Sequence, residues 1–133
     1  MIFRHRIAGG AAEVSAAQAA LARWMEAAGA SPRSITRAEM VMEELALNAQ
    51  RHGGAPEVLV EASIAGRLCN LAFEDAGQPF DPTAGALRPP AASLQAARIG
   101  GLGLALVRRN AEALRYSRSA DGRNRIEVDL ALN

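Results

Sequence analysis

Apolar residues recur at intervals of three and four positions in two long segments, and this spacing predicts two amphipathic helices. The first covers residues 11–28. The second begins after Ser31-Pro32, an N-cap residue followed by a proline suited to the first helical turn, and ends at Gly53-Gly54. The expected buried positions are Val14, Ala17, Leu21, Trp24, Met25 and Ala28 in the first helix, and Ile35, Ala38, Val41, Met42, Leu45 and Ala49 in the second.

Elsewhere apolar and polar residues alternate, which is the period of β-strands. The predicted strands are residues 1–7, 57–64, 67–74, 115–119 and 125–130. The first is expected at a sheet edge, the next two form a hairpin, and the last two flank an Asp121-Gly122 turn. A third helix is expected from Gly101 to about Leu114. Helices combined with hairpins predict an α+β fold, a two-layer sandwich with the helices on one face of the sheet.

Composition narrows the classes of function. The 133 residues are 50% hydrophobic and fit one domain, residues 1–133. The net charge of +1 gives no general electrostatic reason to bind nucleic acid or an anionic membrane. All fifteen basic residues are arginines, so chemistry that needs a lysine, such as the Walker A loop or a Schiff base, is excluded. We expect a protein that binds neither nucleic acid nor membrane directly.

Cysteine and histidine are scarce. Cys69 is the only cysteine and His5 and His52 are the only histidines, which excludes a disulfide within the chain and disfavours a zinc site. The N-terminus has no signal-like segment, and no apolar run approaches the roughly 20 residues of a membrane helix. We therefore expect a cytoplasmic protein in a reducing compartment.

The second predicted helix carries a row of polar residues that could form a functional site. Glu44 and Asn48 are four residues apart and share one face, which Arg51 and His52 continue toward the helix end. A carboxylate, a carboxamide and a guanidinium in line can hold a hydroxyl, a hard cation and a phosphate. The alternative is a solvated helix face, and His52 alone fits a C-terminal cap. Glu43 points about 100° away, which indicates a surface or supporting position.

Two glycine-containing segments add candidate binding positions. Asp75, followed by Gly77, ends the hairpin and offers a carboxylate that can accept a hydrogen bond from a ligand amine. Residues 100–103 read Gly-Gly-Leu-Gly ahead of a helix, and a helix N-terminus suits phosphate oxygens. Between them, residues 77–101 contain four prolines, which indicates either a functional loop or a tolerated insertion.

The three segments together resemble a known superfamily. In order they are Glu44-Leu45-Ala46-Leu47-Asn48-Ala49-Gln50-Arg51-His52-Gly53, Asp75-Ala76-Gly77-Gln78-Pro79-Phe80-Asp81-Pro82 and Gly100-Gly101-Leu102-Gly103-Leu104-Ala105-Leu106-Val107. This order resembles the GHKL (histidine-kinase-like) ATPases, in which three such boxes line one ATP pocket. Within them the chain is similar to the small anti-sigma-factor serine kinases, or switch-protein kinases. The resemblance implies the Bergerat-type sandwich with a mixed, mostly antiparallel sheet and the helices on one face.

The resemblance also implies roles for the residues of the helix box. Asn48 would coordinate Mg²⁺ that bridges the phosphates of ATP. Glu44 would be the general base for the hydroxyl of a protein substrate. Arg51 would lie near phosphate. Phosphoryl transfer depends mostly on positioning and charge neutralisation, so a kinase without lysine is chemically consistent.

The other two boxes would bind the base and the phosphates. Asp75 would accept a hydrogen bond from the adenine amino group, and Gly77 would let the backbone approach the base. One departure from related boxes is Gln78-Pro79, where another glycine is common. The phosphate-binding positions would be Gly101, Leu102, Gly103 and Leu104, and residues 82–99 would form the ATP lid.

The resemblance further implies partners. Such kinases sequester a sigma factor, phosphorylate a serine or threonine of a STAS-domain anti-sigma factor antagonist, and usually form homodimers. A second hypothesis is a non-catalytic regulator that binds its partner according to nucleotide occupancy. A third, the catalytic half of a two-component histidine kinase, is disfavoured because the chain has no room for a helix pair with a phosphoacceptor histidine.

Overall fold

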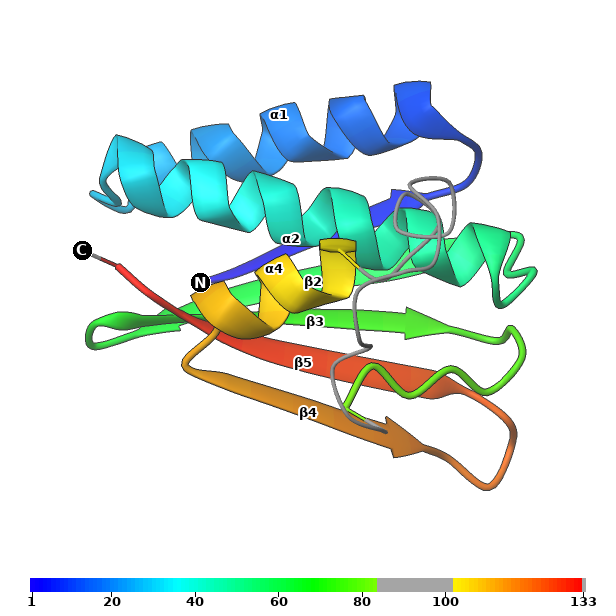
Figure 1. Ribbon diagram of the computed structural model, residues 1–133. Helices are drawn as coiled ribbons and strands as arrows, with labels where there is room; N and C mark the ends of the chain where they lie inside the picture. Colours follow the sequence, from blue (N-terminus) through cyan, green and yellow to red (C-terminus); the bar gives the residue numbers. More distant parts are fainter. Residues whose placement is uncertain (84–101, 133) are drawn as a thin grey trace.

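The computed structural model describes residues 1–83 and 102–132, which form five strands and three helices. In chain order these are β1 (Ile2–Ile7), α1 (Ala11–Ala27), α2 (Pro32–Arg51), β2 (Val58–Ala65), β3 (Leu68–Asp75), α4 (Leu102–Asn110), β4 (Ala113–Arg118) and β5 (Asn124–Ala131). The helices lie together on one face of the sheet (Figure 1). The predicted two-layer α+β sandwich is therefore confirmed, while most of the predicted lid lies outside the described residues.

The sheet has the strand order β1-β2-β3-β5-β4, and each neighbouring pair is antiparallel. β3 is central, so Phe73 lies between Val60 of β2 and Ile126 of β5. Pairing of β3 with β5 also brings Asp75 directly opposite Asn124 at the end of this ladder. The predicted edge position of the first strand and the predicted hairpin are both borne out.

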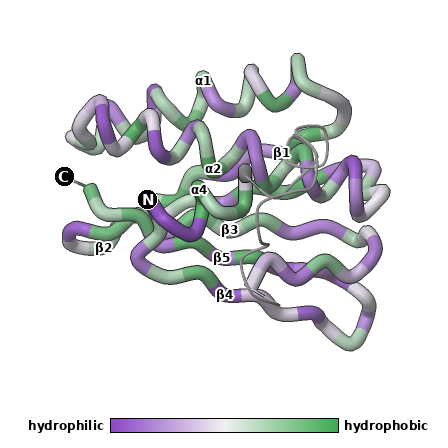
Figure 2. Tube along the Cα trace, viewed as in Figure 1, coloured by the Kyte–Doolittle hydropathy of each residue, from purple (hydrophilic) through white to green (hydrophobic). Residues whose placement is uncertain are grey.

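The two faces of the sheet differ in polarity. In β5 the inward positions Asn124, Ile126, Val128 and Leu130 are buried, and the positions between them are partly exposed. The open face carries ion pairs, including Arg4–Glu61 at 2.7 Å and Arg115–Asp129 at 2.9 Å. Hydropathy along the trace alternates accordingly (Figure 2). Only one face of the sheet therefore needs helices to cover it.

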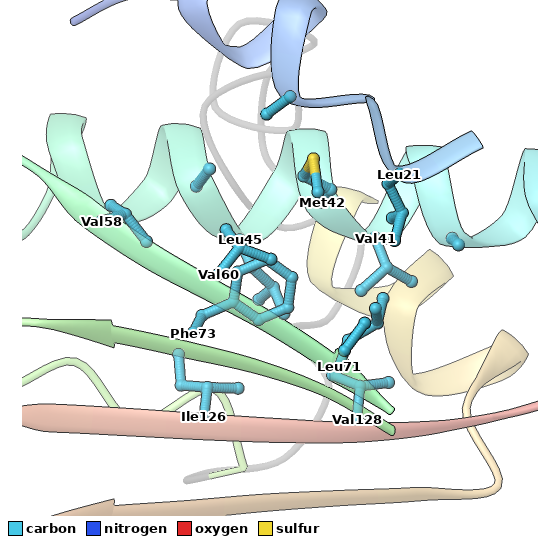
Figure 3. Packing of buried hydrophobic residues seen from close by; sticks show 14 of the residues in the cluster. Leu21, Val41, Met42, Leu45, Val58, Val60, Leu71, Phe73, Ile126 and Val128 are labelled. Atoms are coloured by element: carbon cyan, nitrogen blue, oxygen red, sulfur yellow. The ribbon is translucent and has the colours of Figure 1, made fainter. Parts of the chain in front are cut away.

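The helix α2 fills the centre of the helical layer. Its N-terminus is capped because Ser31 accepts a hydrogen bond from the backbone N–H of Ser34 at 3.2 Å, and Pro32 opens the first turn. Leu45 and Val41 project from α2 toward the sheet, where Phe73 lies in the same core (Figure 3). The helix α1 packs on α2 and β1. In the described part of the chain, no helix is long and apolar enough to cross a membrane.

The structure differs from the sequence-based predictions at the end of the third helix and at three predicted core positions. The third helix ends at Asn110, and Leu114, predicted as its last residue, lies in β4 opposite Val128. A short apolar run fits both periods, and pairing with β5 decides the outcome, beginning where Glu112 N–H donates to the carbonyl of Asp129. Ala28 is exposed because it forms the C-cap of α1, and Trp24 and Ile35 are only half-buried.

The single thiol gives a test of this core. Cys69 on β3 is fully buried, and burial followed by the negative charge of Asp129 raises its pKa to about 11. Only the thiolate reacts with thiol reagents, and about 0.1% of such a group is ionised at pH 8. We expect no modification of the native protein by an aromatic disulfide reagent at pH 8 over minutes, and one thiol per chain after denaturation. Rapid stoichiometric modification of the native protein would contradict the burial of β3.

Candidate nucleotide site

A pocket lies where three segments of the fold meet. These are the C-terminal part of α2, the end of β3 with its following loop, and the start of β5, at one end of the sheet (Figure 1). The cavity between these segments has a volume of about 10 Å³, room for about one water molecule, and it opens to solvent. Leu45, Ala49 and Ile126 supply apolar walls, while the polar groups are Asn48, Asp75 and Asn124. An apolar cleft with a few convergent polar groups is the usual form of a small-molecule site.

Asn48 has an unsatisfied polar group in this pocket. Its side chain is 4% exposed, and Nδ2 has no hydrogen-bond partner within the described residues. Leaving such a group unpaired costs about 1–3 kcal/mol, so the position favours a ligand that supplies the partner. A half-turn of the carboxamide presents its oxygen in the same place, and amide oxygens are suitable ligands for Mg²⁺.

The donor set limits how a metal ion could bind. Across residues 1–83 and 102–132, no group of three or more His, Cys, Asp or Glu side chains is placed to hold one. Mg²⁺ commonly binds through few protein ligands, several waters and the phosphates of its substrate. Asn48 therefore fits a metal ion that arrives with a nucleotide, and the described residues provide no complete protein cage.

Asp75 lines the pocket, and one of its two carboxylate oxygens is hydrogen-bonded within the protein. Its Oδ1 accepts hydrogen bonds from the Gly77 N–H at 2.8 Å and from Asn124 Nδ2 at 3.0 Å. The first of these closes a tight Asx turn after β3. Within the described residues, Oδ2 receives no hydrogen bond. An ionised carboxylate only accepts hydrogen bonds, so its ligand must donate one.

The end of α2 and the loop after β3 meet at Gly53 and Gly77, and neither position has room for a side chain. A Cβ added to Gly77 would lie 2.5 Å from the carbonyl oxygen of Gly53, and one added to Gly53 would lie 2.7 Å from the carbonyl oxygen of Ala49. The Gln78 N–H donates to the carbonyl of Gly53 at 2.8 Å. This bond ties the unusual Gln78-Pro79 segment to α2. In the structure Gly77 is thus needed for backbone packing, while its predicted approach to a base stays a prediction.

Glu44 lies on the same helix, one turn before Asn48, and meets the first turn of α4. A Cβ on Gly103 would overlap the Glu44 carboxylate, so the glycine leaves the space that this carboxylate occupies. Burial raises the pKa of Glu44, and the neighbouring charge of Glu43 raises it further, whereas Arg51 lowers it. The structure therefore places a half-buried carboxylate with a raised pKa beside the start of a helix.

The remaining predicted positions divide into three cases. Arg51 is exposed at the end of α2 and close enough to Glu44 to affect its pKa. Leu104 packs against the hydrophobic core. Gly101 and the side chain of Leu102 lie outside the described residues. The C-cap of α2 is His52, whose ring stacks on Phe80 with centroids 5.7 Å apart.

Sequence reasoning missed Asn124. This residue lines the pocket, is 2% exposed and contacts Asp75, yet no role was expected for it. A signal was present, because an asparagine occupies an inward position in the alternation Asn124, Ile126, Val128 and Leu130. A polar residue at a core-facing position of a strand indicates a buried hydrogen-bonding role.

Comparison with known proteins agrees with this geometry. Residues 7–130 match the model of the histidine kinase-like ATPase domain. Among solved structures, the chain is similar to one in the crystal structure of the SiaB-SiaC complex from Pseudomonas aeruginosa, with a TM-score of 0.61 and 18% identity over 96% of this chain and 88% of that chain. At this identity the likeness concerns the fold. No curated protein matches the chain. Because the family model spans nearly the whole fold, including α2, β3 and β5, the chain belongs to the histidine kinase-like ATPase domains.

Proposed function

We propose that this domain is an ATP-dependent serine/threonine protein kinase of a partner-switching system. It would sequester a sigma factor and phosphorylate a STAS-domain anti-sigma factor antagonist. The observation that carries the kinase assignment is the Glu44 carboxylate against Gly103, one helical turn from the unsatisfied amide of Asn48. A base beside the start of a helix suits a hydroxyl that attacks a phosphate bound there.

The pocket supports the binding of ATP through three groups. Asp75 Oδ2 would accept a hydrogen bond from the adenine amino group, with Ala49 and Ile126 as apolar walls. Asn48 would hold Mg²⁺ together with the phosphates. The ion, when bound, would neutralise charge on the phosphates. The first turn of α4, including Gly103, would face the phosphates with its backbone N–H groups.

Transfer requires Glu44 as an acceptor of one proton. The substrate hydroxyl would lose its proton to the Glu44 carboxylate, its oxygen would form a bond to the γ-phosphorus, and ADP would leave. Arg51, near Glu44 on the exposed end of α2, would contribute positive charge on the phosphate side. Burial of Glu44 supports this role because it raises the pKa toward that of an effective base.

A protein partner is supported by two observations. The similar chain of Pseudomonas aeruginosa was solved as part of the SiaB-SiaC complex, a complex between two proteins. The three boxes of this chain also resemble those of switch-protein kinases. We infer that this chain likewise binds a partner protein, with the sigma factor, the antagonist and a homodimer as the expected assemblies.

The base-binding role of Asp75 can be tested by Asp75→Asn. The new amide keeps an oxygen that accepts from Gly77 and Asn124, but it presents an NH₂ group where Oδ2 faced the pocket. Loss of a hydrogen bond to a charged group should weaken ATP binding about 10- to 100-fold in calorimetry. The control is Asp81→Asn, since Asp81 is exposed and bonds only to Thr83 among the described residues. Equal ATP affinity in both variants would argue against adenine binding at Asp75.

The proposed base can be tested by Glu44→Gln. Removal of a general base should lower the rate of phosphoryl transfer to a STAS-domain substrate by about 10²- to 10⁴-fold while ATP binding is retained. The matched control is Glu43→Gln, the adjacent and exposed residue of the same helix, which should transfer at close to the wild-type rate. A wild-type rate of phosphoryl transfer by Glu44→Gln would overturn the assignment of Glu44 as the base. A stoichiometric partner complex without transfer by the wild-type protein would favour a non-catalytic, nucleotide-gated regulator.

The pH dependence of transfer gives an independent test of Glu44. A base acts only when ionised, so a raised pKa places the acidic loss of activity above pH 4.5, the ordinary value for this group. Glu43→Gln removes a charge that raises the Glu44 pKa and should move that loss to lower pH. Arg51→Gln removes a charge that lowers it and should move the loss to higher pH. Single-turnover rates at saturating ATP measure both shifts, and identical profiles in all three proteins would contradict the assignment.

A further inference from the structure

Asn124 is the most completely hydrogen-bonded polar side chain of the pocket. Its Nδ2 donates to Asp75 Oδ1 at 3.0 Å, to the carbonyl of Gln78 at 2.8 Å and to the carbonyl of Gly77 at 3.3 Å. One amide therefore holds both the carboxylate that ends β3 and the loop that follows it. The contact follows from the sheet, in which Asp75 and Asn124 are paired across β3 and β5.

Two residues of β4 donate hydrogen bonds to the oxygen of the Asn124 side chain. Asn124 Oδ1 accepts a hydrogen bond from Tyr116 Oη at 2.6 Å and from Arg118 Nη1 at 2.8 Å. Arg118 Nη1 also donates to the carbonyl of Gly77 at 3.1 Å. Because a guanidinium only donates, the atom beside Arg118 must be the oxygen of Asn124. Together with the three acceptors around Nδ2, Arg118 and Tyr116 hold the NH₂ group of Asn124 toward Asp75.

The fixed amide determines what Asp75 can offer a ligand. Oδ1 is engaged by the Asn124 amide and the Gly77 N–H, so Oδ2 is the oxygen left toward the pocket. A carboxylate in a fixed place binds an amino group and repels a carbonyl oxygen. A carboxylate that can turn loses part of the attraction and also part of the repulsion. The arrangement thus affects selectivity more than it affects binding of nucleotides in general.

We propose that Asn124, oriented by Arg118, is a positioning residue that makes the pocket select purines with an exocyclic amino group over 6-oxo purines. The proposal rests on the proposed ATP binding and adds the residues that set its base selectivity. Neither Asn124 nor Arg118 touches the phosphates or the reacting hydroxyl in this assignment. Their effect passes through Asp75 and the Gly77 carbonyl.

The test compares ATP with ITP, which carries an oxygen in place of the adenine amino group. Calorimetry gives a dissociation constant for each nucleotide, and their ratio is the readout. A residue that only supports the fold would weaken both nucleotides equally and leave the ratio unchanged. The wild-type protein should bind ATP at least about tenfold more tightly than ITP, as expected for a site built around one hydrogen-bond donor.

Two matched pairs of variants separate positioning from folding. Asn124→Thr retains a hydroxyl donor, whereas Asn124→Val has nearly the shape of threonine without that donor. We therefore expect Asn124→Val to lower the ratio by about tenfold and Asn124→Thr to lower it by less than about threefold. Arg118→Met should lower the ratio because it removes one of the two donors to Asn124 Oδ1 and the hydrogen bond to the Gly77 carbonyl, which loosens the support of Asp75. Arg115→Met is its control on the same strand, since Arg115 pairs with Asp129 on the open face. Both arginines are exposed, and thermal melting reports whether each variant is folded.

The outcomes distinguish this inference from the proposed function. If the wild-type protein prefers ATP but Asn124→Val and Arg118→Met keep the wild-type ratio, the positioning role is overturned and ATP binding stands. If the wild-type protein binds neither nucleotide, the proposed function is overturned and the positioning role with it. A ratio that falls in Asn124→Val and Arg118→Met, and is preserved in Asn124→Thr and Arg115→Met, supports the inference.

Discussion

The backbone contact between Gly53 and Gly77 is the constraint on which the site depends. The end of α2 meets the loop after β3 there, with a hydrogen bond from the Gln78 N–H to the Gly53 carbonyl. A side chain at Gly77 would overlap that carbonyl, and the two segments would have to move apart. Because Asn48 is carried by the one segment and Asp75 by the other, their distance is set by this contact. The site thus depends on two residues that present no functional group to it.

The polar pocket lies directly against the hydrophobic core. Inward positions of β5 change from apolar to polar at its first residue, so Ile126 belongs to both the core and the pocket wall. Buried polar groups are costly unless paired. Asp75 and Asn124 satisfy one another and the adjacent backbone, whereas Asn48 keeps one unpaired amide nitrogen within the described residues. The stability cost is therefore concentrated on the residue assigned to the metal and phosphates.

Hydrophobic periodicity predicted the fold because each element is amphipathic and has one buried face. It placed α2 and the β2–β3 hairpin to within one or two residues. It failed for Leu114, whose short apolar segment carries no distinguishing period, and pairing with Val128 selects the strand. Local motifs indicated Asn48 and Asp75. Asn124 escaped because its role arises from a cross-strand partner 49 residues away, and spacing along a chain does not report such pairings.

Two adjacent acids show why position on the helix matters more than residue type. Glu43 and Glu44 have the same side chain, yet one is exposed, while the other turns toward α4 and has its pKa raised by burial. The raised pKa means that the folded environment disfavours the charged form of Glu44. That cost is offset only in part by Arg51. A carboxylate whose charge is disfavoured, in the space left by a glycine, is what the proposed role of Glu44 as a base would require.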